Sequence, residues 1–213
     1  RLIDPAAGSG IFLVGAYRRL MERNVPAGGW RPRHIGHAKS LMLDCIHGIE
    51  KYPQAANLCR FSLYLTLLDY VGPAPIEKLI KAAGQEKFLP DLRKNIRSAD
   101  AFDRTATAGK YTHVIGNPPW SMTGGQKDRT NQGLDRREVS AAVLAFAGEL
   151  KRSNLAFSHK RLSDLFTWLA VRHLAADGGA IALVLPAKSL IGRAASNFAH
   201  CLATNAAIGW IGN

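Results

Sequence analysis

The 213-residue sequence is poor in cysteine and contains no long apolar run. Its three cysteines, Cys45, Cys59 and Cys201, are an odd number without a CxxC pair, which argues against a disulfide framework and for reduced thiols in a cytosolic protein. The longest apolar runs, such as residues 181–186, are far shorter than the roughly 20 residues that span a bilayer. No apolar segment follows the first residues as it would in a signal peptide. We therefore expect no membrane partner.

Metal-binding spacings are also missing. The histidines stand alone, with no HExxH sequence and no cysteine at ligand spacing. We interpret them as structural or surface residues and predict no metal site.

Acidic residues are scarce beside basic ones, 16 against 28, so the formal net charge is +12. Such a surplus favours a polyanionic partner, because neutralised phosphates release counterions. A basic protein without a polyanionic partner is equally compatible with the charge, so both interpretations stay open at this point.

Short apolar strands alternate with helical patterns along the chain, which predicts one α/β domain with a doubly wound, mostly parallel sheet. Ligands bind such sheets outside the carboxyl ends of the strands. The expected strands are at 2–3, within 41–50, and at 96–99, 112–115, 180–185 and 208–211. The expected helices are at 11–21, 53–69, 76–83, 139–150, 162–175 and 190–202, and Asp177-Gly178-Gly179 is expected to form a turn.

A glycine turn, Asp4-Pro5-Ala6-Ala7-Gly8-Ser9-Gly10, joins the first strand to the first helix. Glycines let a ligand approach the backbone, and the helix start offers free N–H groups. A dinucleotide fingerprint would have Gly or Ala where Leu13 stands, and the Gly-Lys-Ser/Thr of a P-loop is absent. The acidic residue at the head of the turn suggests a ligand with positive charge, such as S-adenosylmethionine. An ordinary strand–helix turn is the alternative.

Two further acidic positions follow strands. Glu50 ends the second strand, where a carboxylate can accept hydrogen bonds from both ribose hydroxyls, although its distance from the glycine turn exceeds the usual ~20 residues. Asp100 follows the third strand and could accept from an adenine amino group, while Phe102 could pack on a ring. The alternatives are a solvated Glu50, a helix-capping Asp100 and a core Phe102.

The tetrapeptide Asn117-Pro118-Pro119-Trp120 is the most specific pattern in the chain. An exocyclic amino nitrogen is a poor nucleophile, because its lone pair is delocalised into the ring. The side-chain oxygen of Asn117 and the carbonyl of Pro118 could accept its two N–H bonds and stabilise the positive charge that develops in the transition state. Prolines fix φ and carry no N–H, and Trp120 offers a flat face for an unstacked base. A Pro-Pro turn with a core tryptophan is the structural alternative.

The sequence resembles bacterial DNA adenine-N6 methyltransferases. Residues 4–13 are similar to their first motif and Asn117–Trp120 to their catalytic Asn-Pro-Pro-aromatic motif. Residues 46–56 are similar to their second motif and residues 177–186 to a later strand motif. The order of the motifs matches the gamma arrangement, as in type I modification subunits and fused restriction–modification enzymes. Ala7 stands where the family often has Cys, and Trp120 stands where Tyr or Phe is commoner.

The resemblance implies a Rossmann-like, S-adenosylmethionine-dependent methyltransferase that modifies the N6 of a flipped adenine in double-stranded DNA. It implies action in the bacterial cytoplasm, together with specificity or restriction components. Residues 1–213 would be the catalytic domain of a longer protein, without the family's N-terminal segment and target-recognition domain. An N-methyltransferase acting on a protein glutamine or an RNA base is the alternative. The implied catalytic residues are Asn117, Pro118, Pro119 and Trp120, and the implied cofactor-binding residues are Asp4, Pro5, Ala6, Gly8, Gly10, Phe12, Glu50, Asp100 and Phe102.

Basic residues follow the catalytic motif and could contact phosphates or hold the flipped base. A solvated basic loop is the alternative. These residues are Lys127, Arg129, Arg136, Arg137, Lys151, Arg152, Lys160 and Arg161.

Overall fold

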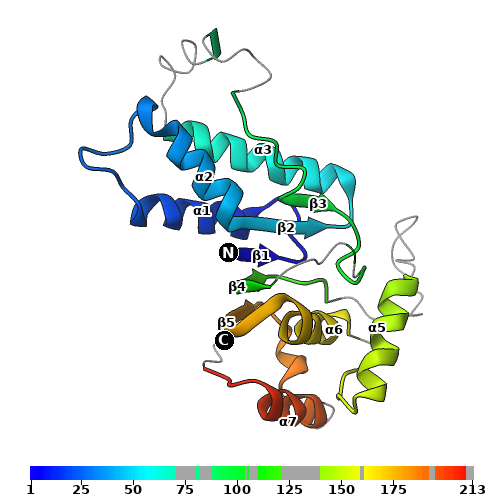
Figure 1. The fold of residues 1–213 in the computed structure, drawn as a ribbon. Coiled ribbons are helices and arrows are strands. Elements are labelled where there is room, and N and C mark those ends of the chain that lie inside the picture. The colour runs from blue at the N-terminus through cyan, green and yellow to red at the C-terminus, as the bar shows by residue number, and fades with distance from the viewer. Residues whose placement is uncertain are drawn as a thin grey trace.

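Five parallel strands form one sheet in the order β3-β2-β1-β4-β5 (Figure 1). The computed structural model describes residues 1–70, 80–81, 88–103, 105, 110–120, 140–158, 161–191 and 195–209. The strands are β1 (Leu2–Asp4), β2 (Ile46–Glu50), β3 (Ile96–Ser98), β4 (Tyr111–Gly116) and β5 (Ala175–Leu183). This order confirms the predicted doubly wound α/β fold.

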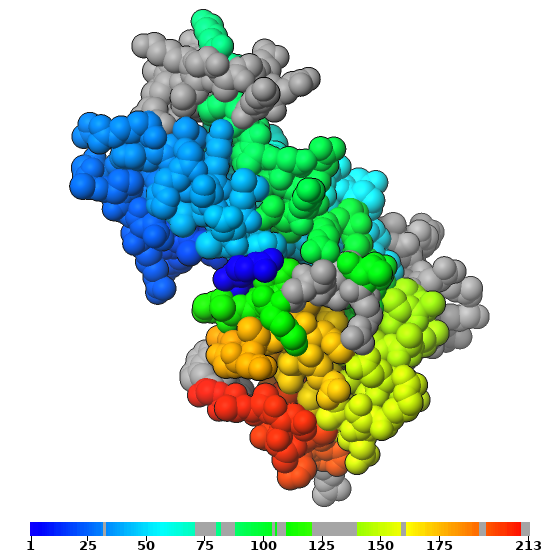
Figure 2. Space-filling view, in the orientation of Figure 1, coloured from blue at the N-terminus to red at the C-terminus, as the bar shows by residue number. Residues whose placement is uncertain are grey.

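Helices cover both faces of the sheet, and neighbouring strand residues point to opposite faces. Leu2 of β1 packs into one apolar cluster, with α1 (Ile11–Arg23), α2 (Ile35–Cys45) and α3 (Pro53–Asp69). Ile3 packs into the other, with α5 (Ala141–Arg152), α6 (Leu162–Leu169) and α7 (Ser196–Asn205). In the space-filling view the N-terminal half, blue to cyan, and the C-terminal half, yellow to red, lie at opposite ends of the molecule, with β4 between them (Figure 2).

Several helix boundaries follow directly from local sequence. α1 begins after Gly10, whose φ of 90° is in the left-handed region that glycine adopts without strain. α3 begins with Pro53, since proline at a first helical position loses no hydrogen bond there. The expected helix at 162–175 consists of α6 and a π-helical turn, η2 (Ala170–Leu174).

The second strand, β2, lies within the expected range 41–50 and ends at Glu50. The helix before it, α2, was not predicted, nor was the short 3-10 turn η1 (Pro32–His34) that precedes α2. Two expectations need correction. The Asp177-Gly178-Gly179 turn lies inside β5 as an irregularity, because Tyr111 pairs with Ala175 while His113 pairs with Ala180. The last helix starts at Ser196 instead of 190, after the 3-10 turn η3 (Ala187–Ser189). The helix expected at 76–83 lies almost wholly outside the described residues, and 208–209 are described but are not in a strand.

Strand order reverses between β1 and β4. From β1 the chain continues to β2 and β3 on one side of the sheet, and β4 then pairs with β1 on its other side. In open α/β sheets such a reversal leaves a crevice at the carboxyl ends of the two strands. Within the part of the chain that the structure describes, no helix is long and apolar enough to cross a membrane.

Candidate functional site

The glycine turn leaves β1 at this crevice and is held by backbone hydrogen bonds. The N–H of Ala7 donates to the carbonyl of Ile49 at 3.0 Å, and that of Gly10 donates to Ala7 at 2.8 Å. A Cβ at Gly10 would lie 2.7 Å from the Sγ of Cys59, so α3 supports the turn closely at this point. Gly10 is therefore required for packing as well as for its φ.

Gly8 is the open part of the turn. Its φ is 54°, and a Cβ placed there would meet no atom of the described residues within 4 Å, its chain neighbours aside. The side of Gly8 on which a side chain would project is therefore open among these residues, as a ligand cradle requires.

Glu50 is joined to the same turn despite its long sequence separation. Its Oε2 accepts from the N–H of Gly8 at 2.9 Å, and its Oε1 accepts from the N–H of Tyr52 at 2.9 Å. A carboxylate oxygen has two lone pairs, so each oxygen keeps one for a hydroxyl donor. The structure thus brings together the glycine turn and the carboxylate that the sequence predicted to share a cofactor.

Asp4 is fully buried at the head of the turn. Its Oδ1 accepts from the N–H of Ala6 at 2.9 Å, while its Oδ2 has no hydrogen-bond partner among the residues that the structure describes. Burial raises the pKa of Asp4 to about 7, helped by the nearby Glu50 carboxylate and opposed by the hydrogen bond from Ala6. Its carboxyl group also lies against Gly116, where a Cβ would be 2.6 Å from Oδ1. Asp4 therefore connects the turn after β1 to the end of β4.

Asp100 and Phe102 lie just after the end of β3. The Oδ1 of Asp100 accepts from the N–H of Phe102 at 3.0 Å and so closes a local turn. The Phe102 ring is buried, with ring centroids 5.5 Å from Phe146 and 4.8 Å from Phe166. The ring therefore lies in the core, which leaves it little free surface. A contact between Asp100 or Phe102 and an adenine ring stays a prediction.

The tetrapeptide Asn117–Trp120 follows β4 directly. Asn117 is exposed and Pro118 is buried, so the amide of Asn117 is not turned into the core. Trp120 is 50% exposed, and its Nε1 donates to the carbonyl of Val184 at 3.3 Å. The indole is thus tethered by its edge to the segment after β5, which favours an oriented ring over a core tryptophan.

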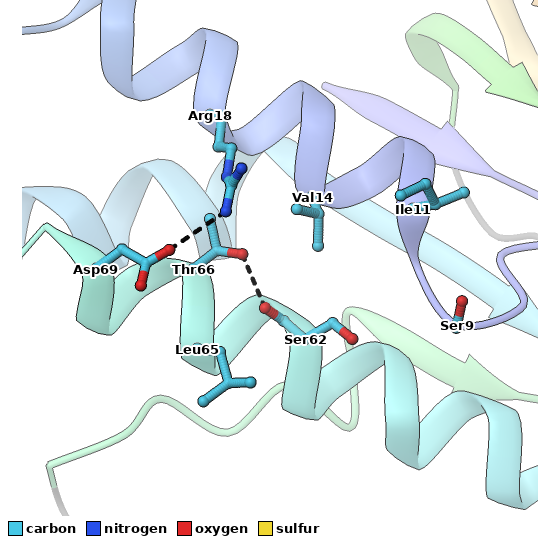
Figure 3. Close-up of a pocket in the computed structure, with 8 residues that line it drawn as sticks. All are labelled: Ser9, Ile11, Val14, Arg18, Ser62, Leu65, Thr66 and Asp69. Atoms are coloured by element: carbon cyan, nitrogen blue, oxygen red, sulfur yellow. Dashed lines mark hydrogen bonds and ion pairs between the residues drawn. The ribbon is translucent and has the colours of Figure 1, made fainter.

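An outer groove of about 430 Å³ lies between α1 and α3 (Figure 3). The ion pair Arg18–Asp69, at 3.3 Å, lies at one end. Ser9 is its only lining residue from the glycine turn, so the groove is distinct from the crevice at the strand ends. It is lined by Ser9, Ile11, Val14, Arg18, Ser62, Leu65, Thr66 and Asp69.

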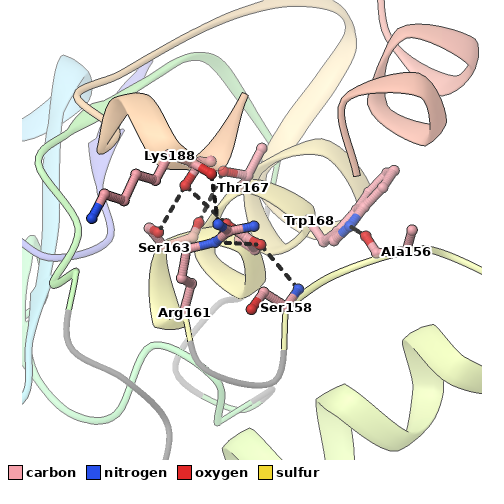
Figure 4. Close-up of polar contacts among 9 residues, drawn as sticks. Ala156, Ser158, Arg161, Ser163, Thr167, Trp168 and Lys188 are labelled. Atoms are coloured by element: carbon pink, nitrogen blue, oxygen red, sulfur yellow. Dashed lines mark hydrogen bonds and ion pairs between the residues drawn. The ribbon is translucent and has the colours of Figure 1, made fainter. Parts of the chain in front are cut away.

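A buried polar cluster around Asp164 of α6, near the end of β5, was not predicted from the sequence (Figure 4). Arg161, predicted to touch phosphate or the flipped base, instead donates to Asp164, and its side chain is only 14% exposed. The signal for this cluster was the position of Asp164. It is an acidic residue in the first turn of a helix whose other residues are nearly all buried. Lys127, Arg129, Arg136, Arg137 and Lys160 lie outside the described residues.

Taken together, the strand order, the open glycine turn and the carboxylate at the end of β2 define a Rossmann-like α/β protein of the methyltransferase type. The sequence profile of the family described as "Eco57I restriction-modification methylase" matches residues 44–212, and the chain belongs to this family. Methyltransferases of this kind use S-adenosylmethionine as methyl donor.

Curated relatives agree with the family. The chain is 26% identical over 177 residues to the adenine-specific methyltransferase PglX of Streptomyces coelicolor, which covers 69% of this chain. It is 31% identical over 127 residues to the type II methyltransferase M.BstVI of Geobacillus stearothermophilus, which covers 56% of this chain. These alignments span 14% and 19% of the two relatives, so both are much longer proteins.

Solved structures show the same fold. The type ISP restriction–modification enzyme LlaGI, in complex with a DNA substrate mimic, superposes with a TM-score of 0.64 at 15% identity. That match covers 95% of this chain and 17% of LlaGI. The DrdV–DNA complex gives a TM-score of 0.60 at 16% identity, over 93% of this chain and 18% of DrdV.

Proposed function

We propose that this chain transfers the methyl group of S-adenosylmethionine to the N6 amino group of adenine in DNA. The observation that carries the proposal is that Asn117 and Trp120 are exposed just after β4, the strand that pairs with β1, while Gly116 at the end of β4 lies against Asp4 at the head of the glycine turn. The family and the adenine-specific relative support it.

The residues around the turn fit the cofactor. Gly8 leaves open space beside the backbone, and both oxygens of Glu50 keep a lone pair for ribose hydroxyls. The unpartnered Oδ2 of Asp4 adds negative potential below the turn when the carboxyl is ionised, which favours a cationic ligand. The other residues of the proposed set are Pro5, Ala6, Gly10 and Phe12, together with Asp100 and Phe102 for the adenine ring. When bound, the cofactor supplies an electrophilic methyl group on a sulfonium.

The target amino group is activated by acceptors on this chain. In the proposed complex, the side-chain oxygen of Asn117 and the carbonyl of Pro118 accept the two N–H bonds of the adenine amine and stabilise its developing positive charge. Because Pro118 and Pro119 carry no N–H and have fixed φ, they keep these acceptors free of competing donors. The half-exposed indole of Trp120 stacks on the extruded base.

We propose double-stranded DNA as the partner, with specificity or restriction components of a bacterial restriction–modification or phage-defence system, in the cytoplasm. The DNA complexes of LlaGI and DrdV and the restriction–modification family support this setting. The net charge of +12 suits a polyanionic substrate.

The test uses the whole protein, tritiated S-adenosylmethionine, and DNA, RNA or a protein extract. We expect label in DNA as N6-methyladenine. Label in RNA or in protein glutamine instead would support the alternative acceptors and reject the proposal.

Asn117→Ala separates chemistry from cofactor binding. We expect turnover to fall at least about a hundredfold, because removing one transition-state acceptor typically costs that much. The cofactor dissociation constant, measured by calorimetry, should change less than about twofold, since Asn117 lies after β4 and not in the turn. Asn24→Ala, an exposed amide at the end of α1, is the matched control and should keep turnover. Parallel losses of turnover and cofactor binding in Asn117→Ala would contradict the assigned role.

A further inference from the structure

A buried carboxylate, Asp164, joins three separate segments near the end of β5. Its Oδ1 accepts from the hydroxyl of Ser189 in η3 at 3.0 Å. Its Oδ2 accepts from the N–H of Ser158, in the loop before α6, at 3.0 Å. Arg161 donates to both oxygens at 3.2 Å and, through Nη1, to the carbonyl of Lys188 at 2.6 Å. Figure 4 shows Ser158, Arg161 and Lys188 converging from these segments. We call Ser158, Arg161, Asp164 and Ser189 the Asp164 cluster.

Net stability is a weak explanation for the cluster. Asp164 and Ser189 are fully buried, and the Nη2 of Arg161 is buried with no hydrogen-bond partner within the described part of the chain. A buried ion pair often adds no net stability compared with an apolar packing of similar volume, since removing both charges from water is costly. What such a pair does supply is a fixed geometry for the segments it joins. Here one of the joined segments is the chain that leaves β5 and carries Lys188 and Ser189.

The segment after β5 is hydrogen-bonded to the segment that carries the proposed catalytic tetrapeptide. Gly116 of β4 pairs with Leu183 of β5, and the N–H of Val184 donates to the carbonyl of Gly116 at 2.9 Å. The carbonyl of the same Val184 accepts the indole N–H of Trp120. Only residues 185–188 separate Val184 from Ser189, and Pro186 among them has a fixed φ. Anchoring Ser189 therefore restricts the position of the group that tethers Trp120.

We propose that Ser189, Arg161 and Asp164 are positioning residues for the target base, acting through Val184 on the orientation of Trp120. This inference rests on the proposed function. The cluster fixes the loop after β5, the loop fixes the acceptor of the indole N–H, and the indole holds the extruded base beside Asn117. Misplacement of reacting groups by about 1 Å can cost up to about a hundredfold in rate.

The main test variant is Ser189→Ala, which removes one hydrogen bond of Asp164 and leaves its ion pair with Arg161 in place. Arg161→Lys is the second variant, since lysine keeps the charge but lacks a second nitrogen for the Lys188 carbonyl. Thr167→Val is the matched control: Thr167 is buried in the same helix and donates to the Ser163 carbonyl, with no bond to Asp164. Each whole protein is compared for melting temperature, cofactor dissociation constant and single-turnover methylation rate at saturating DNA and cofactor.

We expect Ser189→Ala and Arg161→Lys to lower the single-turnover rate about tenfold while changing the cofactor dissociation constant less than about twofold. Thr167→Val should lower the melting temperature to a similar extent but keep the rate. In a Trp120→Phe background, which lacks the indole N–H, the loss from Ser189→Ala should shrink to less than about threefold, because the two changes act on one path.

Three results would overturn the inference: an unchanged rate in Ser189→Ala, an equal rate loss in Thr167→Val, or an undiminished loss in the Trp120→Phe background. A wild-type protein that binds cofactor but does not methylate DNA adenine would overturn the proposed function itself, and the inference with it. An active wild type with a fully active Ser189→Ala would remove the inference alone.

Discussion

Asp4 is the residue at which the fold most changes a titration near neutral pH. In the unfolded chain its carboxyl has an ordinary pKa of 3.8, and in the folded protein burial raises the pKa to about 7. Between these values the folded protein binds more protons than the unfolded chain. The contribution of Asp4 to stability is therefore lost as pH rises through this window.

Asp4→Asn should remove that pH dependence. The amide keeps an oxygen for the Ala6 N–H but does not ionise, so from about pH 5 to about pH 8 the wild type should lose roughly 2 to 3 kcal/mol relative to this variant. Urea unfolding at the two pH values measures the difference.

Asp91→Asn is the control, because hydrogen bonds from Arg93 hold the pKa of Asp91 below its usual range and keep it ionised in this window. Parallel stability curves for the wild type and Asp4→Asn would show that the Asp4 carboxyl stays charged throughout.

At the scale of elements, α3 packs against the glycine turn and limits which residues the turn can contain. It reaches Gly10 through Cys59 but leaves the space at Gly8 open. Two glycines in one turn, both with positive φ, thus have different reasons to be glycine.

Gly10→Ala and Gly8→Ala should separate these reasons. Both place an alanine in the left-handed region at a cost of about 1 to 2 kcal/mol. Gly10→Ala also forces the new Cβ against Cys59, so it should lower the free energy of unfolding by at least about 3 kcal/mol. Gly8→Ala should remain folded and lose at least about tenfold in cofactor affinity, since its methyl group enters the open space. Calorimetry and urea unfolding measure the two effects, and an unchanged cofactor affinity in Gly8→Ala would place the cofactor elsewhere.

Elements with clear local signals could be predicted from the sequence, and elements without them could not. Pro53 predicted the start of α3, and the glycine turn predicted the start of α1. α2 was missed because its last residue, Cys45, is followed at once by the first residue of β2, with no turn residue between them. The Gly178-Gly179 pair predicted a turn, but these residues lie inside β5 as an irregularity, because the strand pairing continues on both sides of them.

The candidate site shows the same limit. Motif residues such as Gly8, Glu50 and Asn117 could be chosen from the sequence, because their chemistry is specific. The Asp164 cluster depends on contacts between segments that are 25 and 27 residues apart, those of Asp164 with Ser189 and of Arg161 with Lys188, which no local pattern reveals.

At the scale of the whole molecule, the basic surplus should govern the strength of DNA binding. If four phosphates are neutralised, the dissociation constant for DNA should rise about a hundredfold between about 50 mM and about 200 mM salt. Cofactor binding without DNA should change little over this range, which provides the internal control. Filter binding or fluorescence anisotropy measures the slope, and a salt-independent affinity would exclude a phosphate-based interface.

All three cysteines of the molecule are unpaired, and Cys59, which lies against the glycine turn, is the least reactive. Burial raises the pKa of the Cys59 thiol to about 12, whereas Cys45 and Cys201 are partly exposed. Because thiolates, not thiols, are alkylated and oxidised, such reagents will modify the two peripheral positions first. The proposed cofactor site should therefore tolerate mild oxidants, and inhibition by a maleimide would report modification elsewhere in the protein.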